Sequence, residues 1–304
     1  YRGDALGEDF KGNAFIADTG SNLIHRKRLH YEGIQPVARR PEDELDREFT
    51  ASTDNWFRPV QFANAPDGCL YVADMYRETI EHPWSIPESI KKHLDLNSGN
   101  NRGRIWRIAP KGFKSPKRAL PGKVKTAQLV DLLAHDNGWT RDTAARLIYE
   151  RQDKSIVPAL ERFAVNAKSS IGRLHSLHAL HGLGALKATL VLKALKDANA
   201  DVRIQAMILA EDFPNDSKVA KAVYAQVDQS SKHMLYQLAL TASRLPDSDH
   251  KKIAIAMALG KAGGDHWIEA AVMNAFTDDL GNMWVAMQGA PTVSASAKIE
   301  FLKL

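Results

Sequence analysis

The pattern of apolar and polar positions changes character once along the chain. In the first part, apolar residues come in short runs between Gly, Asp and Asn, as in "NAFIADTGSNLIHRKRL" and "DGCLYVADMYRETIEHP". Such runs predict strands joined by turns. In the second part, Ala and Leu recur at intervals of three and four residues, which is typical of amphipathic helices. The sequence therefore predicts a β region followed by a helical region.

The β region contains two related units. Asp18 and Asp74 each follow Ala at the end of a predicted strand. Each Asp is expected to cap a tight turn by accepting backbone N–H bonds. A further strand is predicted in "RGRIWRIAP". The spacing of the two strand–Asp–turn units, from Asp18 to Asp74, favours blades of a β-propeller. Because two blades cannot close a propeller, the region is expected to be part of a longer propeller or an open remnant.

The helical region is built from repeats. Similar segments recur, among them "GWTRDTAARLIYER", "SIGRLHSLHALHGL" and "ADVRIQAMILAEDF". A period of about 30 residues with two amphipathic helices in each unit predicts an α-solenoid of HEAT-like hairpins. Such a solenoid is expected to dock a protein partner. The repeats align, at nearly equal intervals, on Arg141, Arg173, Arg203, Leu235 and Glu269.

A basic segment separates the two regions. From Arg102 to Lys125 there are nine Lys and Arg residues and no Asp or Glu, with Pro and Gly spread through the second half. This composition is typical of a solvated linker. The predicted fold class is therefore α+β and multidomain: the last blades of a β-propeller in residues 1–110, a basic Pro/Gly linker in 111–125, and HEAT-like helical repeats in 126–304.

Composition narrows the function classes. The net charge of +5 comes from the basic linker, so it does not argue for a nucleic-acid partner. No apolar run reaches the roughly 18 residues of a membrane span. The single cysteine, Cys69, excludes an internal disulfide, a Cys-based zinc site and a C-x-x-C-H haem attachment. It follows the turn "PDG" at the start of a strand and is expected to be a small packing residue.

Three segments of the β region resemble a known family. They are "YRGDALGEDFKGNAFIADTGSNLIHRKRL", "REFTASTDNWFRPVQFANAPDGCLYVADMYRETIEHPWSIP" and "NRGRIWRI". They resemble the last blades of the large membrane-bound dehydrogenases of planctomycetes and verrucomicrobia. In that family a propeller similar to glucose/sorbosone dehydrogenases precedes HEAT-like repeats, and a haem c domain often follows. The order of regions in this chain is similar over its whole length.

The resemblance implies an exported protein of the periplasm or cell surface. It implies pyrroloquinoline quinone and calcium as cofactors of the full-length protein and haem c in a further domain, with no cofactor bound by this chain alone. A sugar or small alcohol is the implied ligand. Because the chain starts at Tyr1 without Met and shows two blades, it is expected to be a piece of a longer protein and to be inactive alone.

The densest set of polar and aromatic side chains lies in the loops of the β region, where binding sites are often built. Arg58 and Arg77 are expected to hold carboxylates of a substrate or a quinone. Trp56 and Tyr76 offer flat faces for a sugar or another ring. These four residues form the predicted substrate- and cofactor-binding set.

The predicted catalytic set is His82, Glu81 and Asp74. His82 would take a proton, and Glu81 or Asp74 would orient it. The alternative interpretation is structural: Arg–Asp pairs lock loops where a propeller closes, and His82 before Pro83 fixes a turn. No residue is predicted to bind a metal.

Two weaker sets are interpreted as structural. Asn22 suits a turn, and His25 and Arg26 are expected to be exposed strand residues. His175, His178 and His181 resemble a metal row, but the first and last lie about 120° apart on a helix and no carboxylate joins them. They are therefore expected to be histidines of the repeat surface or core.

Two functions from different classes remain. The first is part of a quinoprotein-like sugar or alcohol dehydrogenase, in which Arg58, Tyr76, Arg77 and His82 converge on one face. The second is a non-enzymatic scaffold for protein interaction or glycan binding, in which these residues are satisfied by one another.

A chain comprising residues 126–304 is expected to fold alone, because the stability of a repeat protein is a sum of neighbour contacts. Thermal unfolding followed by circular dichroism at 222 nm should show a cooperative helical transition. A gradual, non-cooperative loss of signal would contradict the predicted boundary.

Overall fold

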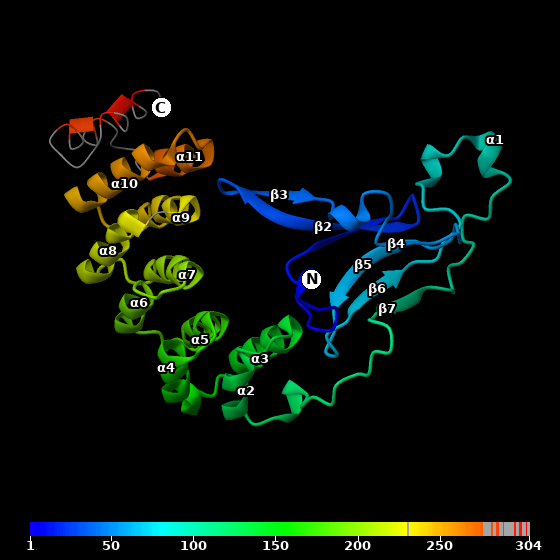
Figure 1. Cartoon of the computed structure of the whole chain (residues 1–304), viewed down its shortest axis with the longest axis horizontal. Helices are drawn as coiled ribbons and strands as arrows, with labels where there is room; N and C mark the ends of the chain where they lie inside the picture. Colours follow the sequence, from blue (N-terminus) through cyan, green and yellow to red (C-terminus); the bar gives the residue numbers. More distant parts are fainter. Residues whose placement is uncertain are drawn as a thin grey trace. The chain divides into compact units, whose positions relative to one another are not determined.

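The computed structural model describes residues 1–229 and 231–275, together with isolated positions beyond residue 280 (281, 284, 285, 288, 295, 298, 299 and 302). The chain forms two compact units (Figure 1). The β unit comprises Tyr1–Glu32, Pro36–Leu120 and Asp136–Asp142; the helical unit comprises Gly33–Gln35, Pro121–His135 and Thr143–Leu304. Most of the predicted repeat region beyond residue 275 lies outside the described residues.

The β unit contains two antiparallel sheets. In one sheet β2 lies between β1 and β3 and also pairs with β4; in the other, β6 lies between β5 and β7. The expected α+β fold class, with a β region followed by a helical region, is confirmed: antiparallel strands lie between residues 14 and 108, and helices packed on one another follow. The strands are β1 (Ala14–Asp18), β2 (Leu23–Glu32), β3 (Gln35–Arg39), β4 (Thr50–Ala51), β5 (Pro59–Asn64), β6 (Leu70–Asp74) and β7 (Arg104–Ile108).

A small apolar cluster contains side chains from both sheets. Ile24 on β2 and Val72 on β6 are each 1% exposed, and Phe57 lies beside them. Aromatic rings that precede β5 extend this cluster, with Phe15 and Phe49 in edge contact at 4.9 Å between ring centroids. Burial of these apolar side chains is the main favourable term in the folding of the β unit.

The turn between β1 and β2 forms as the sequence predicts. The Asp18 carboxylate accepts a hydrogen bond from the Ser21 backbone N–H at 2.9 Å, and this bond lowers the pKa of Asp18. Asn22 occupies the left-handed region (φ 60°), where its side chain donates to the carbonyls of Asn55 and Phe57. The turn therefore holds the segment that leads into β5.

Arg26 is not the exposed strand residue that its charge suggests, and this part of the sequence interpretation is wrong. Its side chain is 3% exposed, because the β1–β2 register places it opposite Phe15 on the covered face. There its guanidinium lies 3.0 Å from the Glu44 carboxylate and 4.4 Å from the centroid of the Phe10 ring. His25 is also largely covered, with 25% of its side chain exposed.

The repeat helices follow the basic segment, which has no regular structure between Phe113 and Leu120. Every helix in the described part of the chain is too short or too polar to cross a bilayer. A short helix, α1 (Glu88–Lys91), belongs to the β unit. The repeat helices are α2 (Thr126–Leu132), α3 (Gly138–Arg151), α4 (Val157–Asn166), α5 (Ser170–Gly182), α6 (Ala188–Ala194), α7 (Ala200–Ala210), α8 (Ser217–Tyr224), α9 (Lys232–Ala242), α10 (Asp249–Ala262) and α11 (His266–Asn274).

The repeat helices pack in two layers. Helices α2, α4, α6, α8 and α10 contact one another in that order, and so do α5, α7, α9 and α11 (Figure 1). One apolar core runs through the repeats, and fully buried leucines such as Leu160, Leu180 and Leu195 lie in it. Each repeat therefore buries its apolar face against the next, as expected for a stack of helical hairpins.

The alignment made from the sequence holds in the structure. Each of the five aligned residues is the fourth residue of its helix, in α3, α5, α7, α9 and α11. Ser169, Asn199, Ser231 and Asp265 cap four of these helices by accepting backbone N–H bonds. Such caps satisfy donors that the first turn of a helix leaves without partners.

In the first three repeats the aligned residue is an arginine, and it binds the loop before its own helix. Arg173 donates to the carbonyls of Ala167 and Lys168, and Arg203 donates to those of Asp197 and Ala198. Arg141 donates to the Asp136 carbonyl in the same way. The repeated arginine therefore satisfies loop carbonyls that the turn leaves without backbone partners.

Arg173 also joins two repeats. Its Nε and second terminal nitrogen lie 2.7 and 2.8 Å from the two carboxylate oxygens of Asp197, in the next loop. Both side chains are mostly covered, at 15% and 11% exposed. The bond with Arg173 lowers the pKa of Asp197, which also accepts from the Asn199 backbone N–H.

Asp197→Asn is expected to lower the free energy of unfolding by about 2 kcal/mol, because it breaks a bidentate, largely buried pair. The folded carboxyl has a lowered pKa, so the pair stabilises the fold above the unfolded pKa of about 4 and is lost as pH falls through the folded value. Urea unfolding at several pH values should therefore show a shallower acid dependence in the variant.

Glu150→Gln is the matched control. Glu150 pairs with Arg146 on the surface of α3, where the two side chains are 54% and 67% exposed. Exposed pairs contribute little to stability, so this variant should unfold as the parent does. Equal destabilisation by the two substitutions would contradict the role given to the Arg173–Asp197 pair.

Candidate functional site

The predicted site residues lie at one edge of the β5–β6–β7 sheet. Because the three strands are antiparallel, the start of β5, the end of β6 and the start of β7 meet at this edge. Pro59 pairs with Asp74 and Asp74 pairs with Arg104 in the register of the sheet. The edge therefore collects side chains that are far apart in the sequence.

Asp74 is the buried centre of this edge. Its side chain is fully covered, and one oxygen accepts hydrogen bonds at 2.9 Å from the backbone N–H groups of Arg58 and Tyr76. The other oxygen accepts from Trp106 Nε1 at 2.9 Å and lies 3.4 Å from Arg104 Nε. The carboxylate is satisfied by these donors, so the expectation that Asp74 caps its turn is confirmed.

Arg58 is also satisfied internally. Its guanidinium donates to the backbone carbonyls of Arg77, Glu78, Thr19 and Gly20, at 2.9 to 3.3 Å. The residue is 9% exposed. Four of the five guanidinium N–H donors are therefore bound by backbone. Arg58 ties the β1–β2 turn to the segment that follows β6.

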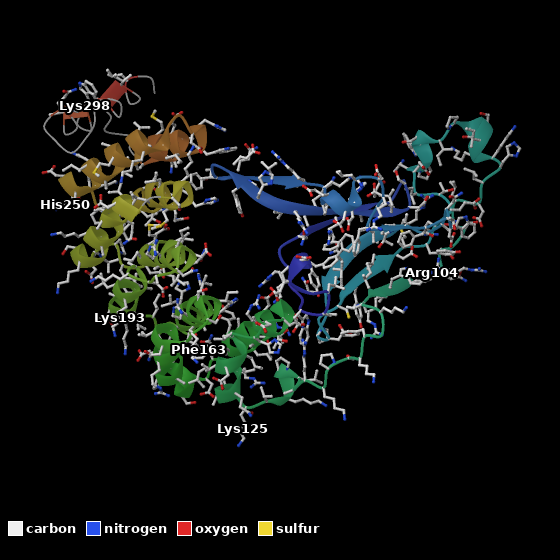
Figure 2. All side chains as sticks on the ribbon, viewed as in Figure 1. Arg104, Lys125, Phe163, Lys193, His250 and Lys298 are labelled. Carbon is white, nitrogen blue, oxygen red and sulfur yellow. The ribbon has the colours of Figure 1, made fainter. Side chains whose placement is uncertain are left out.

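Aromatic rings and one arginine form a row beside this buried pair. Trp56 and Tyr76 lie 5.6 Å apart between ring centroids. The Arg104 guanidinium lies 3.6 Å from the Tyr76 centroid and 5.2 Å from that of Trp106. Figure 2 labels Arg104 on β7. We call Trp56, Tyr76, Arg104 and Trp106 the aromatic row.

The aromatic row is held in place but not covered. Trp106 is 45% exposed and the Arg104 side chain is 37% exposed, whereas Trp56 and Tyr76 are half-buried. Arg104 also lies 3.4 Å from the Asp54 carboxylate. Aromatic faces attract cations through the ring quadrupole, and this attraction holds the Arg104 guanidinium against the Tyr76 and Trp106 rings.

The backbone at Tyr76 has an unusual conformation. Tyr76 adopts φ 51°, a left-handed value that is uncommon for a residue other than Gly. Gly99, at φ 85°, lies directly against the Tyr76 carbonyl, where a β-carbon would clash with the oxygen. Arg77 donates to the Asn97 carbonyl at 2.8 Å and so holds the same loop. The loop between β6 and β7 is therefore closed against the end of β6.

His82 and Glu81 bind backbone N–H groups of their own loop rather than Asp74. The His82 Nδ1 accepts from the Trp84 backbone N–H at 3.2 Å and caps a short 3₁₀ turn, Pro83–Ser85. The Glu81 carboxylate accepts from the Ile80 backbone N–H. Both residues are exposed. Among the described residues, no hydrogen bond or ion pair joins His82 to Glu81 or Asp74.

The structure therefore brings together part of the predicted set. Trp56, Arg58, Asp74 and Tyr76 share one edge, and Arg77 holds the loop beside them. Arg104 and Trp106 also belong to this edge, although the sequence interpretation placed them only in a strand. The sequence feature that could have predicted their position is the alternation in "RIWRI", which puts Arg104 and Trp106 on the face of the sheet that carries Asp74.

A second polar cluster, around His25, was not predicted. His25 Nδ1 lies 2.6 Å from the Glu48 carboxylate, and Nε2 lies 3.8 Å from that of Asp18. Arg40 donates to Glu48 at 2.6 Å and lowers the pKa of that carboxyl. This cluster ties the loop after β3 to the β1–β2 hairpin.

Neither histidines nor the cysteine form a metal site in the described residues, where no three His, Cys, Asp or Glu side chains are placed to hold a metal ion. His178 contacts Gln205 and His181 pairs with Asp212. Cys69 is fully buried, and burial raises the pKa of its thiol to about 11. The expectation that Cys69 is a packing residue is confirmed.

Comparison with known proteins identifies one domain in the chain. A family model described as "Domain of unknown function (DUF7133)" matches residues 1–112. The match covers both sheets and the aromatic row, and it ends within the basic segment. No curated protein matches the chain.

Asp74→Asn is expected to destabilise the sheet edge by about 2 kcal/mol. An amide has one acceptor atom, so either the two backbone N–H groups or the Trp106 indole N–H would lose its partner in a buried place. Hydrogen exchange followed by mass spectrometry should show about 30-fold lower protection of β6 and β7.

Asp46→Asn controls for the loss of one negative charge, because Asp46 is exposed and has no hydrogen-bond or ion-pair partner in the described chain. It should leave the protection of β6 and β7 unchanged. Unchanged protection in Asp74→Asn would show that the carboxylate is not needed at this edge.

Proposed function

We propose that this chain is a binding module. In this proposal the β unit binds a carbohydrate through the aromatic row, and the helical unit docks a protein partner. The chain itself performs no catalysis. The proposal separates two tasks, and each can be tested without the other.

The observation that carries the proposal is the contrast at one edge between buried charged groups and aromatic rings that are exposed at Trp106 and partly exposed at Trp56 and Tyr76. Arg58 and Asp74 are the charged groups at the centre of the predicted dehydrogenase site. Backbone carbonyls bind the Arg58 side chain, and four donors surround the Asp74 carboxylate. A substrate would have to break these bonds before either group could act on it.

The aromatic row has the chemistry that a sugar ring needs. The apolar C–H face of a pyranose stacks on an aromatic ring, and an amphipathic ring such as Trp offers a large contact area. Arg104 lies among the rings and is partly exposed, so its terminal N–H groups are placed to donate to hydroxyl oxygens. Exposed rings around a polar group are a common composition for a ligand site.

The dehydrogenase remains the alternative. It rests on the resemblance of the β region, and it would require pyrroloquinoline quinone, calcium and a haem domain in the full-length protein. An extracytoplasmic location belongs to the same alternative. Reduction of a dye by the full-length protein with quinone, calcium and a sugar would favour it over the binding module.

The docking half of the proposal rests on the repeats. The two layers of helices present long faces, and the first layer carries hollows of about 550 Å³ between α4 and α6 and about 560 Å³ between α2 and α4. Stacked repeats commonly use such extended surfaces to bind other proteins.

The carbohydrate half is tested by calorimetry of the full chain with cellohexaose, laminarihexaose, mannohexaose and chitohexaose. We expect binding of at least one oligosaccharide, and about tenfold weaker binding by Trp56→Ala because one stacking face is lost. Circular dichroism of the variant should match the parent, because Trp56 lies in a turn outside the strands of the sheet.

Trp267→Ala is the matched control, because Trp267 is a partly exposed tryptophan of the helical unit, 45% exposed on α11. It should bind sugar as the parent does. Absence of binding to all four oligosaccharides, or equal loss in the two variants, would sink the carbohydrate proposal.

A further inference from the structure

Two neighbouring hollows lie in the first layer of the helical unit. The hollow between α4 and α6 has a volume of about 550 Å³, and the one between α2 and α4 has a volume of about 560 Å³. Arg162 and Asn166 on α4 line both hollows. A ligand that crosses α4 would therefore contact the same two side chains from either side.

The α4–α6 hollow combines apolar and cationic side chains. Pro158, Val165 and Leu190 line it with apolar groups. Arg162 and Lys193 line it with positive charge, and Lys193 is labelled on α6 in Figure 2. Both cations are exposed.

The α2–α4 hollow has a similar composition. Its apolar lining includes Val130 and Phe163, and Phe163 is labelled on α4 in Figure 2. Lys168 adds a cation at the end of α4, and Asp131 on α2 is the acidic residue of this lining. We call the two hollows together the α4 groove.

Three cations of the α4 groove have no acidic partner in the part of the chain that the structure describes. In the described residues, Arg162, Lys168 and Lys193 form no ion pair. Glu161 is the acidic residue of the α4–α6 hollow, and it is paired with Lys187 at 2.7 Å. The groove therefore presents unneutralised positive charge beside apolar surface.

We infer that the α4 groove binds an extended, acidic segment of a partner protein, with a carboxylate at every third residue and apolar side chains between. Packed helices lie about 8–10 Å apart, and three residues of an extended polyproline-type chain span about 9 Å. Successive carboxylates would then meet the cations on α4 and α6. This inference rests on the docking half of the proposed function and not on the carbohydrate half.

The apolar lining selects a peptide over other polyanions. Val165 is 40% exposed in the α4–α6 hollow, where the buried Leu190 also contributes to the wall, and the partly buried Phe163 lines the α2–α4 hollow. An anionic polysaccharide would satisfy the cations but would leave these apolar surfaces in contact with polar groups. A peptide supplies apolar side chains between its carboxylates and so buries both kinds of surface.

The test measures fluorescence anisotropy of the full chain with a fluorescein-labelled peptide of four Glu-Val-Pro repeats. Proline keeps the peptide extended. We expect saturable binding that weakens as salt rises, because exposed charge pairs are screened. Arg162→Glu/Lys193→Glu should weaken binding at least about tenfold.

Arg28→Glu/Arg102→Glu is the control for net charge. Both residues are exposed in the β unit and have no ion-pair partner in the described chain, so the variant changes charge equally but away from the groove. It should retain parent affinity. Circular dichroism at 222 nm should show unchanged helix content in both double variants.

Two further peptides test the pattern. Gln-Val-Pro repeats should bind at least about tenfold more weakly, because the carboxylates are gone, and a peptide of equal composition with its four glutamates in one block should also bind more weakly. Equal binding of the blocked peptide or of heparin would overturn the inference in favour of general anion attraction. Absence of peptide binding would overturn it also, whatever the result with oligosaccharides.

Discussion

A carboxylate without solvent contact must have its lone pairs satisfied, and Asp74 meets this constraint by collecting donors from around the sheet. Arg58 approaches from the start of β5, Tyr76 from the end of β6, and Trp106 from β7. With its backbone held at Asp74, Arg58 extends its side chain to the β1–β2 turn. Arg104, also beside Asp74, lies against the Tyr76 ring. The edge that carries the aromatic row exists because this one charge is buried and satisfied.

In both units, arginine side chains bind backbone carbonyls of irregular segments. Arg58 binds backbone carbonyls of two separate segments, and Arg173 and Arg203 bind carbonyls of the loops before their helices. Irregular backbone has acceptors that regular structure does not satisfy, and a guanidinium has enough donors to bind several at once. These arginines are therefore structural, whereas Arg162, Lys168 and Lys193 of the α4 groove form no ion pair among the described residues and keep their charge available for a ligand.

Periodic features could be predicted from the sequence, and contacts between distant residues could not. The alignment of the repeats was correct because it depends on local sequence, which places each aligned residue at the fourth position of its helix. The Asp18 turn was correct for the same reason. Arg26 was misplaced because its burial depends on the strand register opposite Phe15, and the position of Trp106 beside Asp74 depends on the pairing of β6 with β7. His82 was grouped with Asp74 because the two residues are near in sequence, but in the structure His82 caps a turn of its own loop and does not bind Asp74.

The repeated arginine also bears on how such a chain can change in length. Arg203 binds carbonyls of its own loop, and so does Arg173, so each of these two hairpins carries the group that binds its own turn. The intervals between repeats differ by a few residues, yet in the first three repeats the arginine keeps its place at the start of the second helix. A gene segment that encodes one hairpin can therefore be duplicated or lost with its turn intact, which leaves the face of the stack free to lengthen or shorten.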